Sequence, residues 1–414
     1  MSLFTKVDDE NNVVEESGEK GGGEKEEIVN ESKEKYEVVE FNDWEEMKLK
    51  KDVLRGIYSY GFEKPSPIQK KAIKPIFDGK DVIAQAQSGT GKTGAFCVGA
   101  LQVLNIEEEK MQVLIIAPTR ELSRQIHSVI TNLGSVMKVK TQLVVGGTST
   151  EGDIKYIKKN SPQVMVGCPG RVYDLIRRKF INPKDIKLII MDEADEMLSV
   201  GFKEQVYNIL QHLNSDVQIG LFSATVPNEI RKLSGKFMRN PIEILVKAEA
   251  LTLEGINQFY VALDDDHLKY VTLKDLYGTI SLSQCIIYCN SIRRVSDLYD
   301  AMKEDNYPVC AIHSNLTKAE RESSYTDFKN GKYRVLISSN VTARGIDIQQ
   351  VSTVINFDIP KDIHTYLHRI GRSGRWGRKG VGINFITRRD YRKIKEIEQY
   401  YHTEIKELPD TFKS

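Results

Sequence analysis

The sequence has few of the residues that stabilise secreted or membrane-spanning proteins. Only five cysteines occur among its 414 residues, and none form a C-x-x-C pair. They therefore predict neither a disulfide framework nor a zinc site, and they suit a reducing compartment. No apolar run approaches the roughly 18 residues of a membrane-spanning helix. The N-terminus also lacks the apolar stretch of a secretory signal, so we expect no membrane association and no export.

The chain also lacks a strong net charge, but its charge is unevenly distributed. Residues 1–40 contain 13 acidic residues against 5 lysines, a net charge of −8, within a total of +1 for the whole chain. The other 374 residues therefore carry +9. Because the first 40 residues are acidic and poor in aromatics, we predict a disordered tail there. The remaining charge is compatible with nucleic-acid binding at a local site.

Apolar segments that alternate with helical stretches predict an α/β fold with two domains. Six strand candidates precede Asn240-Pro241, at Asp81–Gln85, Gln112–Ala117, Thr141–Val145, Gln163–Val166, Lys187–Met191 and Gln218–Phe222. Five more follow, at Gln284–Cys289, Val309–His313, Arg334–Ser338, Thr353–Phe357 and Gly382–Ile386. This alternation is typical of parallel sheets with helices on both faces. We expect a first domain at residues 41–242, a flexible connector at 243–255 and a second domain at 256–414.

A glycine-rich loop with a Lys-Thr pair lies between a strand and a helix at residues 86–93 (Ala-Gln-Ser-Gly-Thr-Gly-Lys-Thr). Such a loop is the phosphate cradle of a P-loop, in which backbone N–H groups and the helix N-terminus face the same anion. We expect Lys92 to reach the terminal phosphates and Thr93 to bind Mg²⁺. The alternative is a glycine-rich turn that merely opens a helix. The preceding strand and the Lys-Thr pair argue against it.

Acidic residues directly follow the apolar strand candidate that ends at Met191. Asp192 would hold the magnesium ion that a P-loop needs, directly or through water. Glu193 would orient or deprotonate the attacking water. Carboxylates are also common at helix N-termini, which is the alternative interpretation of this stretch. The P-loop earlier in the chain favours the catalytic interpretation.

The stretch Asp192–Asp195 (Asp-Glu-Ala-Asp) is the name-giving motif of the DEAD-box RNA helicases, and the chain resembles that family from about Phe41 to near its C-terminus. The other family motifs appear in order, at Gly61–Gln69, Pro118–Leu122, Gly146-Gly147, Pro169–Arg171, Ser223–Thr225, Ala343–Asp347 and His368–Arg375. The resemblance implies two tandem RecA-like domains. Further stretches resemble the initiation factor 4A subgroup, at Leu54–Tyr58, Asp195–Leu198, Leu251–Ile256 and Gly377–Gly380.

The resemblance assigns roles on the nucleotide side. Gln69 would read the adenine edge, Phe62 would stack on the base, and Trp44 would support that contact or simply pack the first helix. Together with Asp347, which would accept from the ribose hydroxyls, they complete a nucleotide site whose phosphate contacts are Ser88, Gly89, Thr90, Gly91, Lys92 and Thr93. The catalytic set would be Lys92, Asp192, Glu193, His368, Arg372 and Arg375, with Arg372 and Arg375 as arginine fingers from the second domain. Asp195, Ser223 and Thr225 would couple hydrolysis to domain closure.

The resemblance also assigns RNA contacts to the phosphate and ribose backbone, which carry no sequence information. These residues are Thr119, Arg120, Gly147, Gly170, Arg171, Arg321, Ser339, Arg344 and Gly345. Several departures from the family pattern lie on this side: Cys168 replaces a usual Thr, Lys318 a Gln, Asn340 a frequent Asp, Ser314-Asn315 a Gly-Asp, and Thr342 a common Trp. On the nucleotide side, Ala86 replaces the first glycine of the generic loop. We therefore expect secure ATP hydrolysis and altered RNA affinity or coupling.

Two functions follow from the resemblance. The first is an RNA-stimulated ATPase that binds single-stranded RNA and separates short duplexes in translation initiation, as a monomer in the cytoplasm. The second is an ATP-locked RNA clamp in mRNA processing with slow, partner-controlled hydrolysis, which would also allow a nuclear location. Both imply ATP and Mg²⁺ as cofactors, RNA as ligand and a helical-repeat scaffold protein as partner. A P-loop GTPase or kinase is disfavoured by Gln69 and the arginine pair.

Overall fold

The computed structural model describes residues 39–86, 89–199, 201–245, 256–279, 284–340, 351–373 and 380–409. The predicted tail, most of the predicted connector and the whole motif Ala343–Asp347 lie outside these ranges, as do parts of the glycine-rich loop and of the motif His368–Arg375. Within them, none of the helices has the length and apolar character needed to cross a bilayer.

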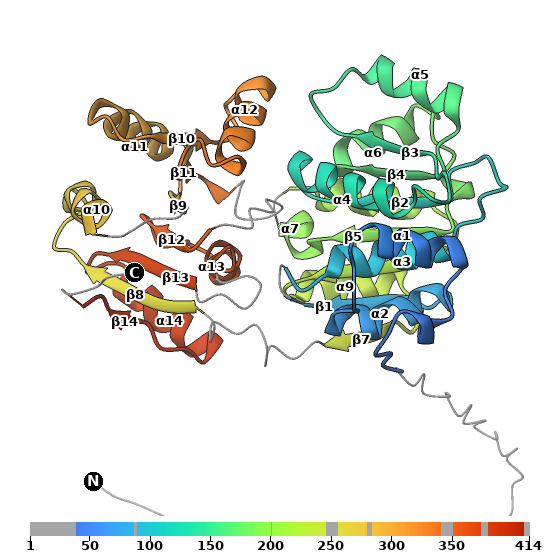
Figure 1. The fold of residues 1–414 in the computed structure, drawn as a ribbon, viewed down its shortest axis with the longest axis horizontal. Helices are drawn as coiled ribbons and strands as arrows, with labels where there is room; N and C mark the ends of the chain where they lie inside the picture. The colour runs from blue at the N-terminus through green and yellow to red at the C-terminus, as the bar shows by residue number, and fades with distance from the viewer. Residues whose placement is uncertain are drawn as a thin grey trace, which may run out of the picture. The chain divides into compact units, whose positions relative to one another are not determined.

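The first domain contains one parallel sheet among its described residues (Figure 1). Its strands are β1 (Val82–Gln85), β2 (Val113–Ile116), β3 (Thr141–Val144), β4 (Val164–Gly167), β5 (Leu188–Asp192), β6 (Gln218–Ser223) and β7 (Ile242–Leu245), in the order β3-β4-β2-β5-β6-β1-β7. Its helices are η1 (Glu45–Met47), α1 (Lys51–Ser59), α2 (Pro67–Phe77), α3 (Lys92–Val103), α4 (Arg120–Leu133), α5 (Thr150–Asn160), α6 (Pro169–Arg177), η2 (Pro183–Asp185), α7 (Ala194–Ser199), α8 (Lys203–His212) and α9 (Asn228–Phe237).

The second domain repeats this plan without a P-loop. Its strands are β8 (Ile256–Ala262), β9 (Cys285–Tyr288), β10 (Val309–Ile312), β11 (Val335–Ser338), β12 (Thr353–Asn356), β13 (Gly380–Ile386) and β14 (Lys406–Glu407), in the order β10-β11-β9-β12-β13-β8-β14. Its helices are α10 (Leu268–Thr279), α11 (Ile292–Glu304), α12 (Lys318–Lys329), α13 (Ile363–Ile370) and α14 (Tyr391–Tyr401). The predicted pair of parallel α/β sheets is confirmed.

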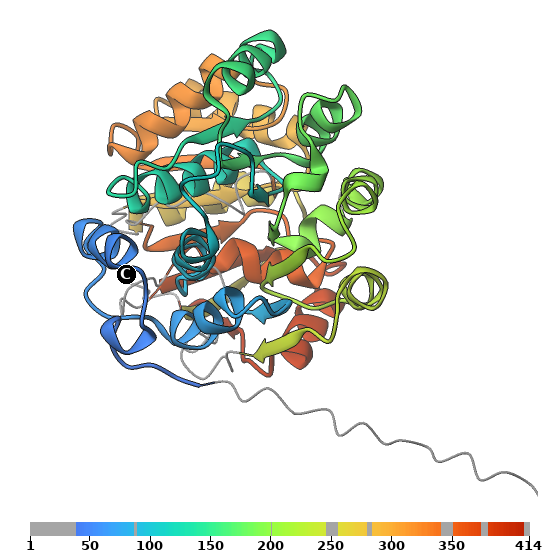
Figure 2. The same ribbon diagram turned by 90° about the vertical axis from the view of Figure 1, so that its right-hand side faces the viewer.

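Both faces of the first sheet are covered, which is why its central strands are continuous apolar runs. Val113 and Ile115 of β2 pack into a core with α1 to α4, whereas Leu114 and Ile116 pack into a second core with α6 to α9. In Figure 2 the blue and teal helices accordingly lie on the opposite side of the strands from the green ones. The period of two along each strand sends alternate side chains to the two cores.

The sequence interpretation missed three strands, and all three lie toward one end of a sheet. β7 pairs with β1 beyond the last predicted strand, and β8 and β14 extend the second sheet next to β13. In β7 only Ile244 is buried, and β14 is exposed throughout. Such strands carry no apolar run, because a sheet edge leaves many side chains in water. β7 also means that the first sheet includes residues 243–245 of the stretch predicted as connector.

The register of the central strands brings the motif residues to one edge of the sheet. Gln85 at the end of β1 lies opposite Ser223 of β6, and Asp192 at the end of β5 lies opposite Phe222. Parallel strands all end at the same edge, where ligands bind in open α/β sheets. The P-loop, the acidic motif and the Ser-Ala-Thr motif therefore start side by side, although they lie far apart in the sequence.

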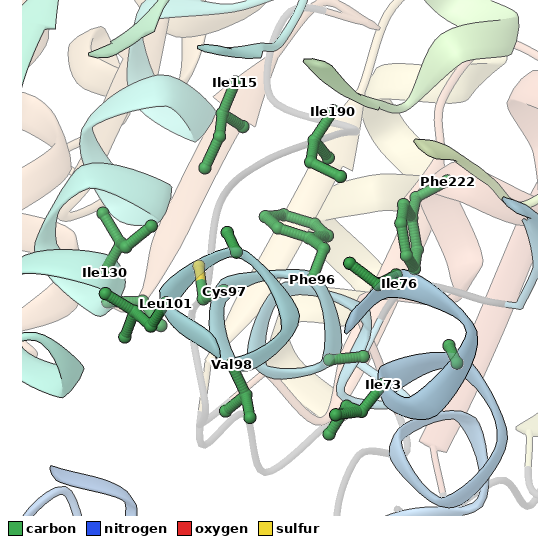
Figure 3. Packing of buried hydrophobic residues seen from close by; sticks show 14 of the residues in the cluster. Ile73, Ile76, Phe96, Cys97, Val98, Leu101, Ile115, Ile130, Ile190 and Phe222 are labelled. Carbon is green, nitrogen blue, oxygen red and sulfur yellow. The ribbon is translucent and has the colours of Figure 1, made fainter. Parts of the chain in front are cut away.

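The helix that follows the P-loop is anchored in the core on all sides. Eight consecutive residues of α3, from Gly94 to Leu101, are buried. Phe96 points from this helix toward Ile190 and Phe222 (Figure 3), and the Phe96 and Phe222 rings meet edge to face at 5.0 Å between centroids. A helix that is apolar on every side is held by its whole surface. The P-loop thus ends on a rigid support.

We expect Phe96→Ala to destabilise the first domain by about 3–5 kcal/mol, because it leaves a cavity against Phe222 and Ile190. Urea unfolding followed by the fluorescence of Trp44, which is fully buried in this core, would measure the loss. A Trp376→Phe background removes the only other tryptophan. The matched control Phe96→Leu keeps most of the volume, and its cost should be well below that of Ala. Equal midpoints for the two variants would contradict this account.

Candidate functional site

The P-loop has the backbone that its glycines allow. Gly89 and Gly91 adopt φ angles of 87° and 97°, in the left-handed region where a Cβ is strained. Lys92, the first residue of α3, is buried, and its Nζ donates to the Ala86 carbonyl at 2.7 Å. The same ammonium lies 3.8 Å from a carboxylate oxygen of Glu193. Ser88, predicted here as a phosphate contact, lies outside the described residues, whereas Thr90 and Thr93 are partly exposed at the loop.

The predicted adenine-reading residues gather at the same loop. The Gln69 side chain accepts from the Ser66 backbone N–H at 2.8 Å and donates to the Gly91 carbonyl at 3.2 Å. Its amide keeps one further lone pair and one further N–H for a base edge. A Cβ built on Gly94 would meet this amide at 2.5 Å and the Phe62 ring at 3.0 Å, so both side chains reach the start of α3. Gln69 thus connects the adenine side directly to the P-loop.

Trp44 has a different position from the one expected of a nucleotide contact. Its side chain is 0% exposed, and its ring stacks on Phe62 with 6.3 Å between centroids. A fully buried ring offers no surface to a ligand. Trp44 can therefore serve the nucleotide site only through Phe62, as a packing support in the first core.

Three carboxylates with little access to solvent lie beside Lys92. Asp192, Glu193 and Asp195 are 2%, 3% and 5% exposed. Burial, followed by the charges of Glu193 and Asp195, raises the pKa of Asp192 to about 7, and Lys92 only partly opposes this. Glu193 adopts a positive φ of 51°, which is uncommon for a non-glycine residue. A group of buried oxygen donors with one nearby ammonium fits a hard divalent cation, so the donor set suits Mg²⁺.

Asp195 is the point where the motifs of the two domains meet. Its Oδ2 accepts from the Thr225 hydroxyl at 2.8 Å and lies 3.4 Å from Nε2 of His368. Ser223 is buried at the end of β6, where its hydroxyl accepts from the Thr225 backbone N–H at 3.4 Å. One turn after His368, Arg372 is 3% exposed and donates from Nε to the His368 carbonyl at 3.3 Å. The predicted coupling residues and two predicted catalytic residues are therefore brought together.

Some predicted site residues cannot be located. Arg344, Gly345, Asp347 and Arg375 lie outside the described residues, as does Thr342. Their roles in the ribose contact, in RNA binding and as a second arginine finger stay predictions.

A large cavity of about 1340 Å³ adjoins the acidic motif. Five of the residues predicted to bind RNA line it, namely Thr119, Arg120, Gly170, Arg171 and Arg321. Asp195 and Thr225 line it as well, so the cavity reaches the carboxylate that contacts His368. Two predicted RNA residues, Gly147 and Ser339, are not among its lining residues. The Ser339 hydroxyl is buried and has no hydrogen-bond partner within the described ranges.

The glycine pair makes room for an arginine. A Cβ built on Gly147, which has a φ of +80°, would meet Nη1 of Arg120 at 2.6 Å. At Gly146 the corresponding distance to Nη2 is 3.2 Å. Both glycines therefore let the Arg120 guanidinium lie flat against the backbone at the cavity wall, where a phosphate would bind. The two glycines are therefore explained by the space that the arginine side chain needs and, at Gly147, also by the positive φ angle.

Two other predicted RNA-binding arginines use their donors inside the protein. Arg171 forms a short ion pair with Asp153 and donates to the Thr148 carbonyl at 3.0 Å. Arg321 of α12 donates to a Glu121 carboxylate oxygen at 3.4 Å and to the Ser314 carbonyl at 3.1 Å. Arg171 thus ties the loop after the glycine pair to α5, and Arg321 links α12 to α4. No pattern in the sequence pointed to either partner.

Asn340, one of the departures from the family pattern on the RNA side, accepts hydrogen bonds from a buried arginine of the second domain. Arg369 is 0% exposed and donates from Nε (2.9 Å) and Nη2 (2.5 Å) to the Asn340 carboxamide oxygen. Its other donors reach Asn290 at 2.8 Å, Asn356 at 3.1 Å and the Asp358 carbonyl at 2.7 Å. These acceptors are all neutral, and burial lowers the pKa of Arg369 to about 10. The residue thus positions the motif that carries His368 and Arg372.

Comparison with known proteins gives matches over both domains. The model of the DEAD/DEAH box helicase family matches residues 66–233, and that of the helicase conserved C-terminal domain matches residues 268–377. The ATP-dependent RNA helicase eIF4A of Pyricularia oryzae is 49% identical over 366 residues, which cover 88% of this chain and 92% of that protein. Eukaryotic initiation factor 4A of Caenorhabditis elegans is 50% identical over 368 residues, with 89% and 91% covered.

Solved structures give the same result for the fold. Dbp5 of S. cerevisiae bound to RNA and ADP BeF3 superposes with a TM-score of 0.82 at 36% identity, over 89% of this chain and 95% of that chain. The two parallel sheets therefore match tandem RecA-like domains.

Cys168 supplies the first test of the departures. It is the N-cap residue of α6 and lines the cavity, but its side chain makes no capping hydrogen bond. Burial raises the pKa of its thiol to about 11, so it stays protonated at neutral pH. We expect Cys168→Thr to stabilise the first domain by about 1 kcal/mol through a capping hydroxyl, and to tighten RNA binding severalfold. Urea midpoints and RNA titrations would measure both effects.

The control for this test is Cys168→Val, which has the shape of threonine without the hydroxyl. If Val and Thr gave the same stability and the same affinity, packing rather than the hydroxyl would explain the result.

The buried guanidinium of Arg369 supplies the second test. Asn340→Asp replaces a neutral acceptor with a charged one at an exposed position, so we expect about 1 kcal/mol of added stability at neutral pH. The pKa of the new carboxyl would be depressed in the folded state. The gain should therefore be present above the ordinary value of about 4 and be lost as the pH falls below it. Thermal unfolding at several pH values would measure this, with Asn340→Ala as the destabilised control. If the thermal midpoint of Asn340→Asp differed from that of the wild type by the same amount above and below pH 4, this explanation would be contradicted.

Proposed function

The chain belongs to the DEAD-box family of ATP-dependent RNA helicases, and we propose that it couples ATP hydrolysis to the binding of single-stranded RNA and to local separation of short duplexes. The observation that carries the proposal is the position of Asp195. One carboxylate oxygen contacts Thr225 of the first domain and His368 of the second, and the same residue lines the cavity of the predicted RNA contacts. RNA that binds in the cavity would therefore directly affect the contacts of Asp195 in the acidic motif.

On the nucleotide side, each described residue has a chemical task. Gln69 and Phe62 bind the adenine edge and face, and Lys92 binds the terminal phosphates. Thr93 and Asp192 would hold Mg²⁺, which supplies neutralising charge at the phosphates. Glu193 accepts the proton of the attacking water, a contribution of typically 10²–10⁴ in rate.

Closure of the two domains would bring positively charged arginines of the second domain to the phosphates. Arg372, together with Arg375, stabilises the charge that develops on the transferred phosphoryl group, an effect of about 10³–10⁵ in rate. Arg372 is supported through the His368 carbonyl, and His368 in turn contacts Asp195. Hydrolysis therefore depends on contacts that need both domains.

On the RNA side, Thr119, Arg120 and Gly170 would contact phosphates and 2′-hydroxyls within the cavity, with Gly147 supporting Arg120. Because such contacts ignore the bases, they accept any sequence and select RNA over DNA. A bent single strand fills the cavity, and a duplex does not. Each closure would thus separate a few base pairs without movement along the strand.

The biological setting is part of the proposal. Relatives named as initiation factor 4A support a role in translation initiation. We further propose that the protein acts as a monomer in the cytoplasm, with a helical-repeat scaffold as partner. We propose domains at residues 41–245 and 256–414, because β7 carries the first sheet to Leu245, with a connector at 246–255 and an acidic tail at 1–40. The alternative function, an ATP-locked RNA clamp, is distinguished by whether RNA stimulates ATP hydrolysis.

Steady-state ATP hydrolysis with and without single-stranded RNA tests the function. We expect RNA to raise the ATP hydrolysis rate of the wild type. In Glu193→Gln we expect the hydrolysis rate to fall at least 10²-fold, because the amide cannot accept the proton of the attacking water. Thr225→Val removes only the hydroxyl that binds Asp195. We expect it to keep ATP binding and basal hydrolysis but to lose most of the RNA stimulation.

Two results would contradict the proposal. Wild-type hydrolysis that ignores RNA, with RNA retained for as long as ATP is present, would favour the clamp. Full RNA stimulation in Thr225→Val would remove the assigned role of Asp195.

A further inference from the structure

We propose that a basic surface on α5 and α6 is a second RNA-binding segment, which binds the single strand after it leaves the cavity. This α5–α6 surface consists of Lys155, Lys158, Lys159, Arg177, Arg178 and Lys179, all of which are exposed. The inference rests on the proposed function, because it extends the same RNA site.

The charge of this segment is strongly one-sided. Residues 154–180 contain seven lysines and arginines but a single acidic residue, Asp174, in a chain whose total charge is only +1. Arg171 is paired internally with Asp153, which leaves the six members of the surface facing solvent. Clustered cations on one face are the electrostatic footprint of nucleic-acid binding.

The fold brings these cations together from two separate helices. Ile154 and Ile157 of α5 and Phe180 after α6 all pack against the same core of the first domain. Figure 1 shows both helices at the same end of that domain. The Lys158 ammonium lies 5.3 Å and the Arg178 guanidinium 5.2 Å from the centre of the single Phe180 ring. Two like charges are thus held close together, an arrangement that a polyanion relieves.

The surface is continuous with the cavity through α6. Gly170 and Arg171, at the start of this helix, line the cavity, and so does Asp174 one turn later. The Asp174 carboxylate in turn lies 3.1 Å from Arg177 and 3.5 Å from Arg178. The basic surface therefore begins at the rim of the cavity. This continuity favours RNA over an acidic protein segment, because a strand that occupies the cavity has to leave it somewhere.

An aromatic ring lies among the cations. Tyr156 of α5 is 41% exposed, although its hydroxyl donates to the Thr141 carbonyl at 3.2 Å. That hydrogen bond fixes the ring while leaving part of it in solvent. Exposed rings interleaved with cations are typical of sites that bind single strands by stacking and by charge without reading sequence.

The test compares RNAs of two lengths in the presence of a non-hydrolysable ATP analogue. A short oligouridylate of about six nucleotides fills the cavity alone, and one of about sixteen reaches beyond it. In Lys158→Glu/Lys159→Glu/Arg178→Glu we expect the long RNA to bind at least tenfold more weakly and the short RNA to bind as in the wild type. The dependence of log affinity on log salt for the long RNA should become shallower by about 2, which corresponds to three lost phosphate contacts.

The matched control carries the same charge change in the second domain. Arg388→Glu/Arg389→Glu/Arg392→Glu alters exposed residues at and before α14 that do not line the cavity, and it should bind both RNAs as the wild type does. Tyr156→Ala should weaken the binding of the long RNA about fivefold or more without changing its salt dependence. Tyr156→Phe, which keeps the ring, should bind the long RNA with the affinity of the wild type.

Three results would overturn the inference. The first is unchanged affinity for long RNA in the α5–α6 variant. The second is an equal loss in the control variant, which would mean a general charge effect. The third is competition by polyglutamate as effective as that by RNA of equal charge, which would assign the surface to an acidic protein. Failure of the wild type to bind even the short RNA would instead reject the proposed function.

Discussion

The arrangement of this protein depends on three buried carboxylates in the acidic motif at the end of β5, one of which lies 3.8 Å from the Lys92 ammonium. Asp192, Glu193 and Asp195 repel one another in a buried setting, and burial together with this repulsion raises the pKa of Asp192 to about 7. The second domain contributes polar and cationic groups, of which His368 meets Asp195 directly. Buried carboxylates that repel one another are stabilised by a metal ion or by basic groups. Electrostatics thus gives a reason for the two domains to close.

The RNA side follows a different rule, because many of its cations are already engaged. Arg171 pairs with Asp153, and Arg321 pairs with Glu121. Both arginines also donate hydrogen bonds to backbone carbonyls. They shape the cavity wall together with Arg120, whose guanidinium lies beside the glycine pair. Affinity for a polyanion then depends on cations that remain exposed to solvent. The α5–α6 surface supplies a group of them at the cavity rim.

The departures from the family pattern also differ in kind once their surroundings are known. Cys168 leaves a helix without a capping hydrogen bond at the cavity. Asn340 instead works inside the second domain, where it holds the fully buried Arg369. A residue counted as an RNA-side change is therefore also a structural support for the motif of His368 and Arg372. Its effect would reach hydrolysis through that motif.

By itself, the sequence determined the central strands and predicted which residues of the first domain meet at their ends. Apolar runs identify buried strands, and residues just after parallel strands share one edge, so Lys92, Asp192 and Ser223 could be grouped before any coordinates. The tertiary structure alone decided the edge strands β7 and β14, the neighbouring strand β8, the burial of Trp44, and the partners of Arg171 and Arg369. The physical reason is that a strand at or next to a sheet edge leaves many side chains in water and so lacks an apolar pattern. In addition, an ion pair or hydrogen bond between distant residues depends on where the fold brings them, which no local pattern records.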